Sequence, residues 1–300
     1  MCYCFPYYAF YCTILSNFFI VTHPFKVNYE NKEISVMIKI GSNYLSLQNT
    51  NVEAFIKVAY DLRLDIVDFH QRAFASTNPE YLSNIKMLCL RYGLPIGYIG
   101  VSGLFIGTDA QRQEHLQRCK DAIDLAAFLG APIIRVFCAT SPEKDTDDGN
   151  VWSKMIIGYQ EVADYASQKG IAVGLQNHPS TGDEMLSIQR ETDRKNFAFI
   201  VDTGQWVGSP GASPRGETDT DVDFYHFMEQ TVPYAMYIRT KFYKIESGRE
   251  EWLDYERIIG ILKNIKYNGC ISIVYEGQKE DRVEQIRLAA NYLRQLLENH

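Results

Sequence analysis

Polar side chains interrupt several short apolar segments of this chain, and most of them lie near the carboxyl end of their segment. A polar residue in a stretch that otherwise reads as buried is informative, because its burial costs free energy unless it has a partner. The set comprises Asp68, His70, Arg135, Gln176, Asn177, His178, Asp202, Arg239, Lys241 and Glu276. Gathered in one place, these groups suit a polar, oxygen-rich ligand, and the carboxylates of Asp202 and Glu276 with an amide oxygen suit a divalent cation such as Mg2+ or Mn2+.

The apolar segments that carry these residues are typical of buried parallel strands, since they are short runs rich in Ile and Val. Eight are predicted, near 38–43, 65–70, 94–101, 132–138, 171–178, 197–202, 234–241 and 270–276, and a helical pattern follows each. Eight such units in about 260 residues predict a closed (β/α)8 TIM barrel of class α/β. An open doubly wound sheet is the alternative, but it would carry a glycine-rich loop after the first strand, and GSNYLSL is not one.

Glycines and caps punctuate this repeat. Gly93, Gly130, Gly170 and Gly269 each stand where a helix should end and a strand begin. Asn78 before Pro79, Asp109 and Asp254 are expected to cap helix N-termini. The strand-to-helix links are long, at 139–150, 178–184 and 203–220, and barrel sites are built from such links. The glycine-containing 203–220 loop is expected to close over a ligand.

Alternation along the strands predicts which polar residues meet. Gln176 and His178 share one face of their strand, and Arg239 and Lys241 share one face of theirs. If these faces point inward, they meet Asp202 and Glu276 at the barrel mouth. Plainer interpretations stay open for each residue: a helix cap for either acid, an ion-pair partner for either base, and an ordinary loop position for the histidine.

Composition separates the first residues from the rest. Residues 1–36 are rich in Tyr, Phe and Cys, lack the pattern of a secretory signal and hold an apolar run that is short for a membrane span. We therefore expect 1–36 to be an N-terminal extension outside the fold and 37–300 to be the barrel domain. The net charge of −7 disfavours a nucleic-acid partner. Seven cysteines without a Cys-x-x-Cys pair favour buried thiols in a reducing, cytoplasmic compartment.

Four motifs add a family resemblance. GLQNH at 174–178, FIVDTGQW at 199–206, YIRTKF at 237–242 and WLDYERIIGILKNIKYNGCISIVYEG at 252–277 resemble the sugar phosphate isomerase/epimerase superfamily, the xylose isomerase-like TIM barrels, over about residues 38–297. The resemblance implies a divalent cation held by Glu, Asp, His and Glu from strands five to eight, with the two glutamates moving protons through an enediolate. It also implies a homodimer as a family expectation.

The chain departs from that pattern. Gln176 stands where the resemblance implies a glutamate, Arg239 stands in place of the histidine, and Gln205 replaces a histidine common after the aspartate. Only Asp202 and Glu276 match directly. Glutamine can offer an amide oxygen to a metal but cannot act as a base, and arginine cannot ligate a metal at all.

We therefore predict an isomerase- or epimerase-like enzyme of carbohydrate metabolism that acts by proton transfer on a small keto-sugar, polyol or related acid. The expected metal ligands for Mn2+ or Mg2+ are Gln176, Asp202 and Glu276; the catalytic residues are Glu276, His178 and Lys241; the substrate-binding residues are Arg135, Arg239, Gln205 and His70. Two alternatives remain: a metal-independent lyase or isomerase that uses Arg239 and Lys241 as electrophiles, and a non-catalytic sugar-binding relative. A nuclease on the same barrel is disfavoured because the chain is acidic and has only six histidines. Neither nucleic acid nor membrane is an expected partner.

Overall fold

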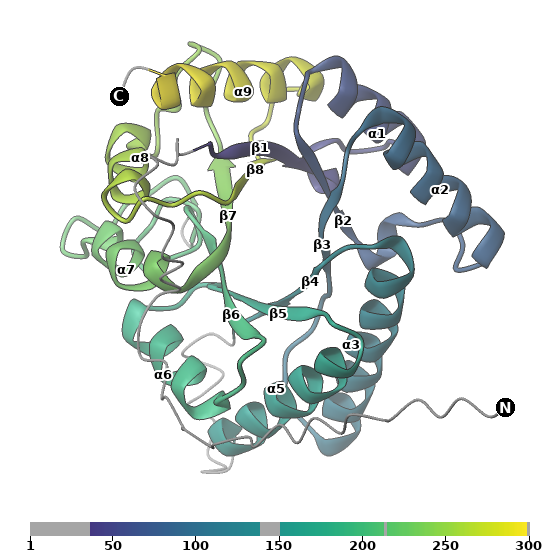
Figure 1. Cartoon of the computed structure of the whole chain (residues 1–300). Helices are drawn as coiled ribbons and strands as arrows, with labels where there is room; N and C mark the ends of the chain where they lie inside the picture. Colours follow the sequence, from purple (N-terminus) through teal and green to yellow (C-terminus); the bar gives the residue numbers. More distant parts are fainter. Residues whose placement is uncertain (1–36, 139–150, 213–214, 299–300) are drawn as a thin grey trace, which may run out of the picture. The chain divides into compact units, whose positions relative to one another are not determined.

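The fold is a closed barrel of eight parallel strands. The computed structural model describes residues 37–138, 151–212 and 215–298. Each strand pairs in parallel with the next, and β1 pairs with β8 to close the ring (Figure 1). The strands are β1 (Lys39–Asn43), β2 (Ile66–His70), β3 (Ile96–Gly100), β4 (Ile133–Phe137), β5 (Ala172–Gln176), β6 (Phe197–Asp202), β7 (Ala235–Phe242) and β8 (Cys270–Tyr275). The predicted TIM barrel is confirmed, and the open sheet is excluded.

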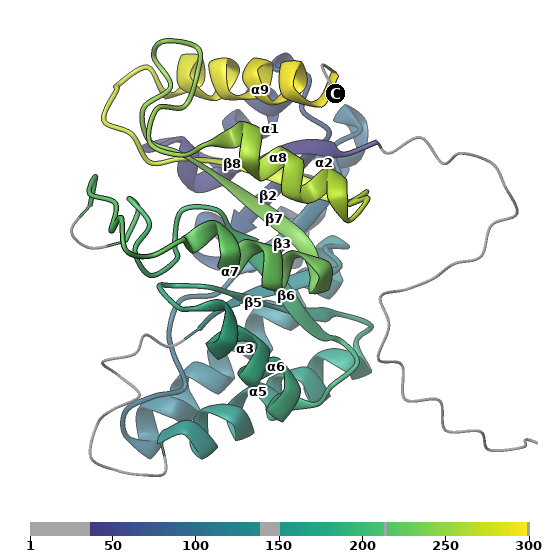
Figure 2. The same ribbon diagram turned by 90° about the vertical axis from the view of Figure 1, so that its left-hand side faces the viewer.

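Helices lie on the outside of the barrel, as Figures 1 and 2 show from two directions. They are α1 (Val52–Asp61), α2 (Pro79–Tyr92), α3 (Asp109–Leu129), α5 (Val151–Gln168), α6 (Gly182–Thr192), α7 (Phe224–Thr231), α8 (Tyr255–Asn264) and α9 (Arg282–Glu298). In the described part of the chain, no helix has the length and apolar character needed to cross a membrane. The expectations for residues 1–36 and for the 139–150 loop lie outside the described residues.

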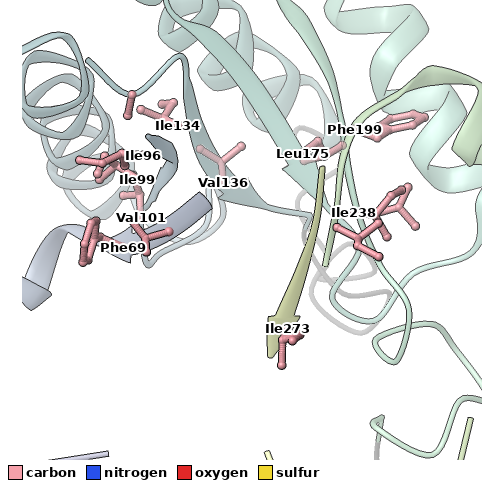
Figure 3. Close-up of a cluster of buried hydrophobic side chains, with 14 of the residues drawn as sticks. Phe69, Ile96, Ile99, Val101, Ile134, Val136, Leu175, Phe199, Ile238 and Ile273 are labelled. Carbon is pink, nitrogen blue, oxygen red and sulfur yellow. The ribbon is translucent and has the colours of Figure 1, made fainter. Parts of the chain in front are cut away.

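Alternate residues of each strand pack outward against the helices. Figure 3 shows such side chains from several strands, among them Phe69, Ile134, Leu175, Phe199 and Ile238. Each is fully buried. The intervening residues therefore face the barrel interior. A small apolar cluster lies there, made of Ile66, Tyr98, Ile133, Ile200 and Tyr237. The polar residues at the strand ends continue these inward rows.

Most predicted helix ends are confirmed. The Asn78 side chain accepts from the backbone N–H of Glu80 at 2.8 Å, and Asp254 accepts from that of Arg257 at 3.0 Å. The prediction that Asp109 is a cap is wrong, because Thr108 is the N-cap of α3. Its hydroxyl accepts from the N–H of Gln111 at 3.3 Å, and the Gln111 side chain accepts from the N–H of Thr108 in return, which satisfies two backbone donors at once.

Gly93, Gly130 and Gly170 take the left-handed conformation expected of helix-ending glycines, whereas Gly269 does not. Helix α8 already ends at Asn264, and Lys266 adopts the left-handed conformation with φ +56°. Glycine is required at 269 for space rather than for φ, since a Cβ there would lie 2.5 Å from the Tyr267 hydroxyl. The prediction that Gly269 ends a helix in the left-handed conformation is therefore wrong.

Candidate active site at the barrel mouth

Asp202 is the centre of a buried polar cluster at the carboxyl ends of β5 to β8. Its Oδ2 atom accepts from Gln176 Nε2 and from Arg239 Nε, each at 3.1 Å, and lies 3.7 Å from Lys241 Nζ. Its Oδ1 atom accepts from the backbone N–H of Gly204 at 3.1 Å, which is the local cap that the sequence left open. Asp202 is fully buried, so these bonds replace water around its charge.

Glu276, directly after β8, extends this cluster toward solvent. Lys241 Nζ donates to its Oε1 atom, and Arg215 Nη2 donates to its Oε2 atom at 2.7 Å. The side chain is 33% exposed, whereas that of Asp202 is inaccessible. Burial raises the pKa of Glu276, but Lys241 and Arg215 more than offset this and hold the pKa below its ordinary value. Glu276 is therefore ionised at neutral pH, and Lys241 links the two carboxylates.

The inner end of Arg239 rests on a tyrosine. Arg239 Nη1 donates to the Tyr98 hydroxyl, and Asn43 Nδ2 donates to the same oxygen at 2.8 Å. Tyr98 comes from β3 and is fully buried. The guanidinium group is thus held at one end by Asp202 and at the other by Tyr98. Sequence reasoning missed both Tyr98 and Asn43, although alternation along β3 places the tyrosine on the inward face.

Asp68 lies deeper in the barrel, next to this cluster. Its Oδ1 atom accepts from the Tyr237 hydroxyl at 2.8 Å, and the side chain is fully buried. Gly97 leaves the necessary space, since a Cβ there would lie 2.4 Å from that oxygen. Burial raises the pKa of Asp68 to about 7 against the opposing effects of Ser272, Tyr237 and Arg239.

Replacing Asp68 with asparagine is expected to flatten the pH dependence of stability. The folded-state pKa of about 7 lies above the ordinary 3.8. The stability contributed by proton binding is therefore full below the ordinary pKa and is lost as pH rises through 7. The difference in unfolding free energy between Asp68→Asn and the parent protein should therefore shift in favour of the variant by roughly 2 kcal/mol from pH 5 to pH 8, as measured by urea unfolding. The exposed Asp121→Asn variant should show no such shift. The same shift in both variants would contradict the raised pKa of Asp68 as its cause.

Arg135 and His178 lie on the β4–β5 side of the mouth, joined by an aromatic ring. The Arg135 guanidinium carbon is 4.0 Å from the centre of the Phe137 ring, which is 4.5 Å from that of His178. Burial lowers the pKa of His178, although Asp202 acts in the opposite direction. The imidazole is accordingly neutral at pH 7 and able to accept a proton.

His70 and Gln205 are bonded to their own surroundings. The His70 ring contacts the Ser102 hydroxyl through Nε2 at 2.8 Å and accepts the Arg72 N–H through Nδ1 at 3.1 Å. Gln205 Nε2 donates to the Gly211 carbonyl at 3.2 Å. Because these polar atoms are already engaged locally, the geometry gives no support to the substrate-binding role predicted for either residue.

The first part of the loop after β6 is packed into the fold. Trp206 is fully buried, and the Ser209 hydroxyl, itself buried, donates to the Gly204 carbonyl at 2.8 Å. A Cβ at Gly211 would lie 1.9 Å from the Tyr243 hydroxyl, so this segment is held close to β7. From the same loop Arg215 reaches Glu276. No sequence signal pointed to Arg215, because its partner is set only by the path of the loop.

A cavity of about 650 Å3 opens beside Glu276. Arg215 and Glu276 line it together with Tyr243, Trp252 and Lys279. The Tyr243 and Trp252 rings are stacked, with centres 5.1 Å apart. The cavity has the size of a small-molecule site, and Glu276 is the carboxylate of the cluster that faces it.

The donor set does not fit a divalent cation. Arg239, Lys241 and Arg215 are all paired with Asp202 or Glu276, so three positive groups surround two carboxylates. Gln176 Oε1 and, deeper in the barrel, Asp68 Oδ2 are buried without a hydrogen bond, whereas the carboxylate oxygens of Asp202 and Glu276 are all bonded to basic or amide groups. Within the described ranges, no group of three or more His, Cys, Asp or Glu residues is placed to hold a metal ion. A cation entering this cluster would meet net positive charge and carboxylates already bound.

Comparisons with known proteins agree with this architecture. Residues 56–296 match the family described as xylose isomerase-like TIM barrel. D-psicose 3-epimerase from Clostridium cellulolyticum H10 superposes with a TM-score of 0.70 at 16% identity, covering 87% of this chain and 99% of that one. An L-ribulose 3-epimerase gives 0.69 at 15% identity with coverage of 88% and 95%, and the 3-keto-D-glucoside 4-epimerase of E. coli gives 0.68 at 15% identity with coverage of 86% and 98%. At these identities the likeness shows the fold. No curated protein matches the sequence.

Proposed function

Because the chain belongs to the xylose isomerase-like TIM barrel family, we propose that it is an enzyme of isomerase or epimerase type. Its substrate would be a small keto-sugar or a related polyol or acid, and its reaction the transfer of a proton at a carbon next to a carbonyl group. The three superposed structures named above are sugar epimerases, which supports this reaction class. The cavity beside Glu276 supports a small polar substrate.

We further propose that basic side chains take the electrostatic part that a metal would otherwise play. One observation carries this: Arg239 and Lys241 are bonded to Asp202 and Glu276, the two acids that match the family pattern. A guanidinium group fixed by Asp202 and Tyr98 is a preorganised cation, and such groups stabilise charge that develops on an oxygen.

In this mechanism Glu276 is the base. Its carboxylate takes a proton from the carbon next to the substrate carbonyl, and the bonding electrons pass to the carbonyl oxygen to form an enediolate. The Lys241 ammonium group, which contacts Glu276, and the Arg239 guanidinium group stabilise that oxygen. Delivery of a proton by a second group to the other face of the same carbon gives an epimer, and return of the proton from Glu276 to the neighbouring carbon gives an isomer. The neutral His178 is the second group able to carry a proton.

A ligand-binding protein without turnover is the second candidate. It is favoured by the burial of the cluster, because Gln176, Asp202, Arg239 and Lys241 are each at most 4% exposed. Such a cluster could serve as a rigid base for the neighbouring cavity rather than as reacting groups. The two candidates differ in whether any carbon-bound proton exchanges.

Proton exchange tests the proposed function without knowledge of the product. The protein would be incubated in D2O with D-fructose, D-tagatose, L-ribulose and small 2-keto acids, and deuterium incorporation at the carbon next to the carbonyl followed by NMR. We expect incorporation for at least one compound. We also expect its rate to stay within about twofold after dialysis against EDTA, since the stabilising charges belong to the chain itself.

Two results would overturn parts of this proposal. Loss of exchange on chelation, with recovery on adding Mn2+, would contradict the metal-independent mechanism while keeping the reaction class. Absence of exchange with every compound, together with saturable binding of one of them, would favour the non-catalytic candidate.

A further inference from the structure

Arg135 is a buried arginine that makes no ion pair with any acidic residue in the described part of the chain. It is 2% exposed, and its Nε atom has no hydrogen bond. The guanidinium group donates to the Val101 carbonyl at 3.4 Å and lies over the Phe137 ring. Among the residues that the structure describes, no carboxylate lies within salt-bridge distance of it. A buried charge normally has a partner, because moving a cation out of water costs roughly several kcal/mol of free energy when no other group replaces its bound water.

The fold makes room for this side chain. A Cβ at Gly100, on the neighbouring strand β3, would lie 2.6 Å from Arg135 Nη2. Gly100 does not adopt a left-handed conformation, so the glycine serves the guanidinium group and not a turn. Burial and the neighbouring Arg239 lower the pKa of Arg135 to about 9, so it remains charged at pH 7. The fold thus provides space for the guanidinium group, although no carboxylate among the described residues pairs with it.

The charges around the mouth have a surplus of the same sign. Four basic groups face it from the β4, β7 and β6-loop sides: Arg135, Arg239, Lys241 and Arg215. The opposing carboxylates are Asp202 and Glu276, with Asp68 below them. Whether Asp68 is protonated or ionised, the sum over these described residues is positive. A negatively charged ligand would offset this surplus, whereas a neutral sugar would leave it unchanged.

We infer that the substrate carries a carboxylate group and that Arg135 binds it. This inference rests on the proposed function and narrows its substrate class to a sugar acid or a similar keto or hydroxy acid. The planar guanidinium fork matches a carboxylate with two parallel hydrogen bonds, and Nε is one of the donors that this pairing uses. A single arginine suits the one charge of a carboxylate.

The position of Arg135 also orients the ligand. Strands β4 and β8 lie on opposite sides of an eight-stranded ring. A carboxylate on Arg135 directs the rest of the molecule across the mouth toward Lys241 and Glu276, which places the reacting carbons away from the charged end. The Phe137 ring, which contacts the Arg135 guanidinium group, lies 4.5 Å from the ring of His178.

Gluconate and glucitol form a matched pair for the test, because they differ only in a carboxylate against a hydroxymethyl group. Calorimetric titration should show gluconate binding roughly 10- to 100-fold tighter than glucitol to the parent protein, as expected for a charge-assisted pair. Arg135→Met should remove this preference, and Arg135→Lys should retain part of it, since lysine keeps the charge and loses the fork. The control Arg91→Met, on the exposed face of α2, should keep the full preference.

Stability distinguishes binding from a structural role. Since Arg135 pairs with no carboxylate of residues 37–138, 151–212 or 215–298, Arg135→Met should not lower the thermal midpoint by more than about 3 °C. A larger loss, with the gluconate preference retained in Arg135→Lys and Arg135→Met alike, would assign Arg135 to the fold. Should Arg135→Met not fold, equal affinity of the parent protein for gluconate and glucitol would still overturn the inference.

Failure of this inference can be told from failure of the proposed function. Deuterium exchange of a neutral keto-sugar that Arg135→Met leaves unchanged would remove the carboxylate assignment and keep the reaction class. Arg135-dependent binding of gluconate without exchange of any compound would keep the carboxylate assignment and remove the reaction class. Tighter binding of D-fructose 6-phosphate than of gluconate, lost in Arg135→Met, would overturn the carboxylate in favour of a phosphate.

Discussion

Replacing Asp202 with asparagine is expected to lower the free energy of unfolding by about 3–5 kcal/mol at pH 7, because the change removes one partner of a buried ion pair. Arg239 would then keep its charge inside the barrel without a carboxylate partner, next to the neutral Tyr98 hydroxyl. The Gly204 N–H and Gln176 would each lose a charged acceptor as well. Urea unfolding followed by circular dichroism measures the change.

The matched control is Asp164→Asn, which weakens an arginine–aspartate pair on the surface. Asp164 accepts from two nitrogens of Arg194, at 2.5 and 3.0 Å, but is 54% exposed. We expect a loss below about 1 kcal/mol, since water replaces the lost partner. Equal losses in the two variants would mean that burial does not govern the Asp202 pair.

A double substitution separates the pair from its surroundings. Asp202→Asn combined with Arg239→Met should destabilise the protein by less than the sum of the two single changes, because neither charge is then left alone. Simple additivity would show that the two side chains act independently, against the 3.1 Å contact between them.

The second large effect concerns Glu276. Glu276→Gln is expected to reduce the rate of deuterium exchange by about 10²–10⁴-fold, because glutamine has the shape of the base without its ability to take a proton. Gluconate should still bind, since Arg135 is on the opposite side of the mouth. The free energy of unfolding should change little, because the side chain is partly in water and Lys241 still has Asp202 at 3.7 Å.

Glu246→Gln is the control, because Glu246 lines the same cavity and changes the local charge by the same amount. Its exchange rate should remain within about twofold of the parent rate, as electrostatic effects at an exposed position are screened. Equal rates in Glu276→Gln and the parent protein would exclude Glu276 as the base and leave His178 as the group to test.

The sequence alone was enough to predict that the site residues lie together. Parallel strands place their carboxyl ends at one rim of a barrel, and alternation along a strand decides which side chains turn inward. On those two grounds Gln176, Asp202, Arg239 and Glu276 were expected around one opening, and the structure places them there. The roles assigned to them stay predictions.

The sequence alone did not predict local contacts that depend on the exact path of the backbone. Thr108 rather than Asp109 caps α3, because a reciprocal pair of bonds with Gln111 outweighs a single acidic side chain one residue later. Both residues are good caps by type, and only the backbone path separates them. Gly269 was assigned to a helix end, whereas its reason is the ring of Tyr267.

The amino-acid sequence by itself determined the barrel and the inward rows of its strands, because periodicity and segment length are properties of the chain's local chemistry. Tertiary structure decided the partners. It placed the Tyr98 hydroxyl against Arg239, brought Arg215 from a loop onto Glu276, and left Arg135 Nε without a hydrogen bond. Pairings of this kind depend on how far charged side chains reach across a closed ring, and that distance is set only when all eight strands have met.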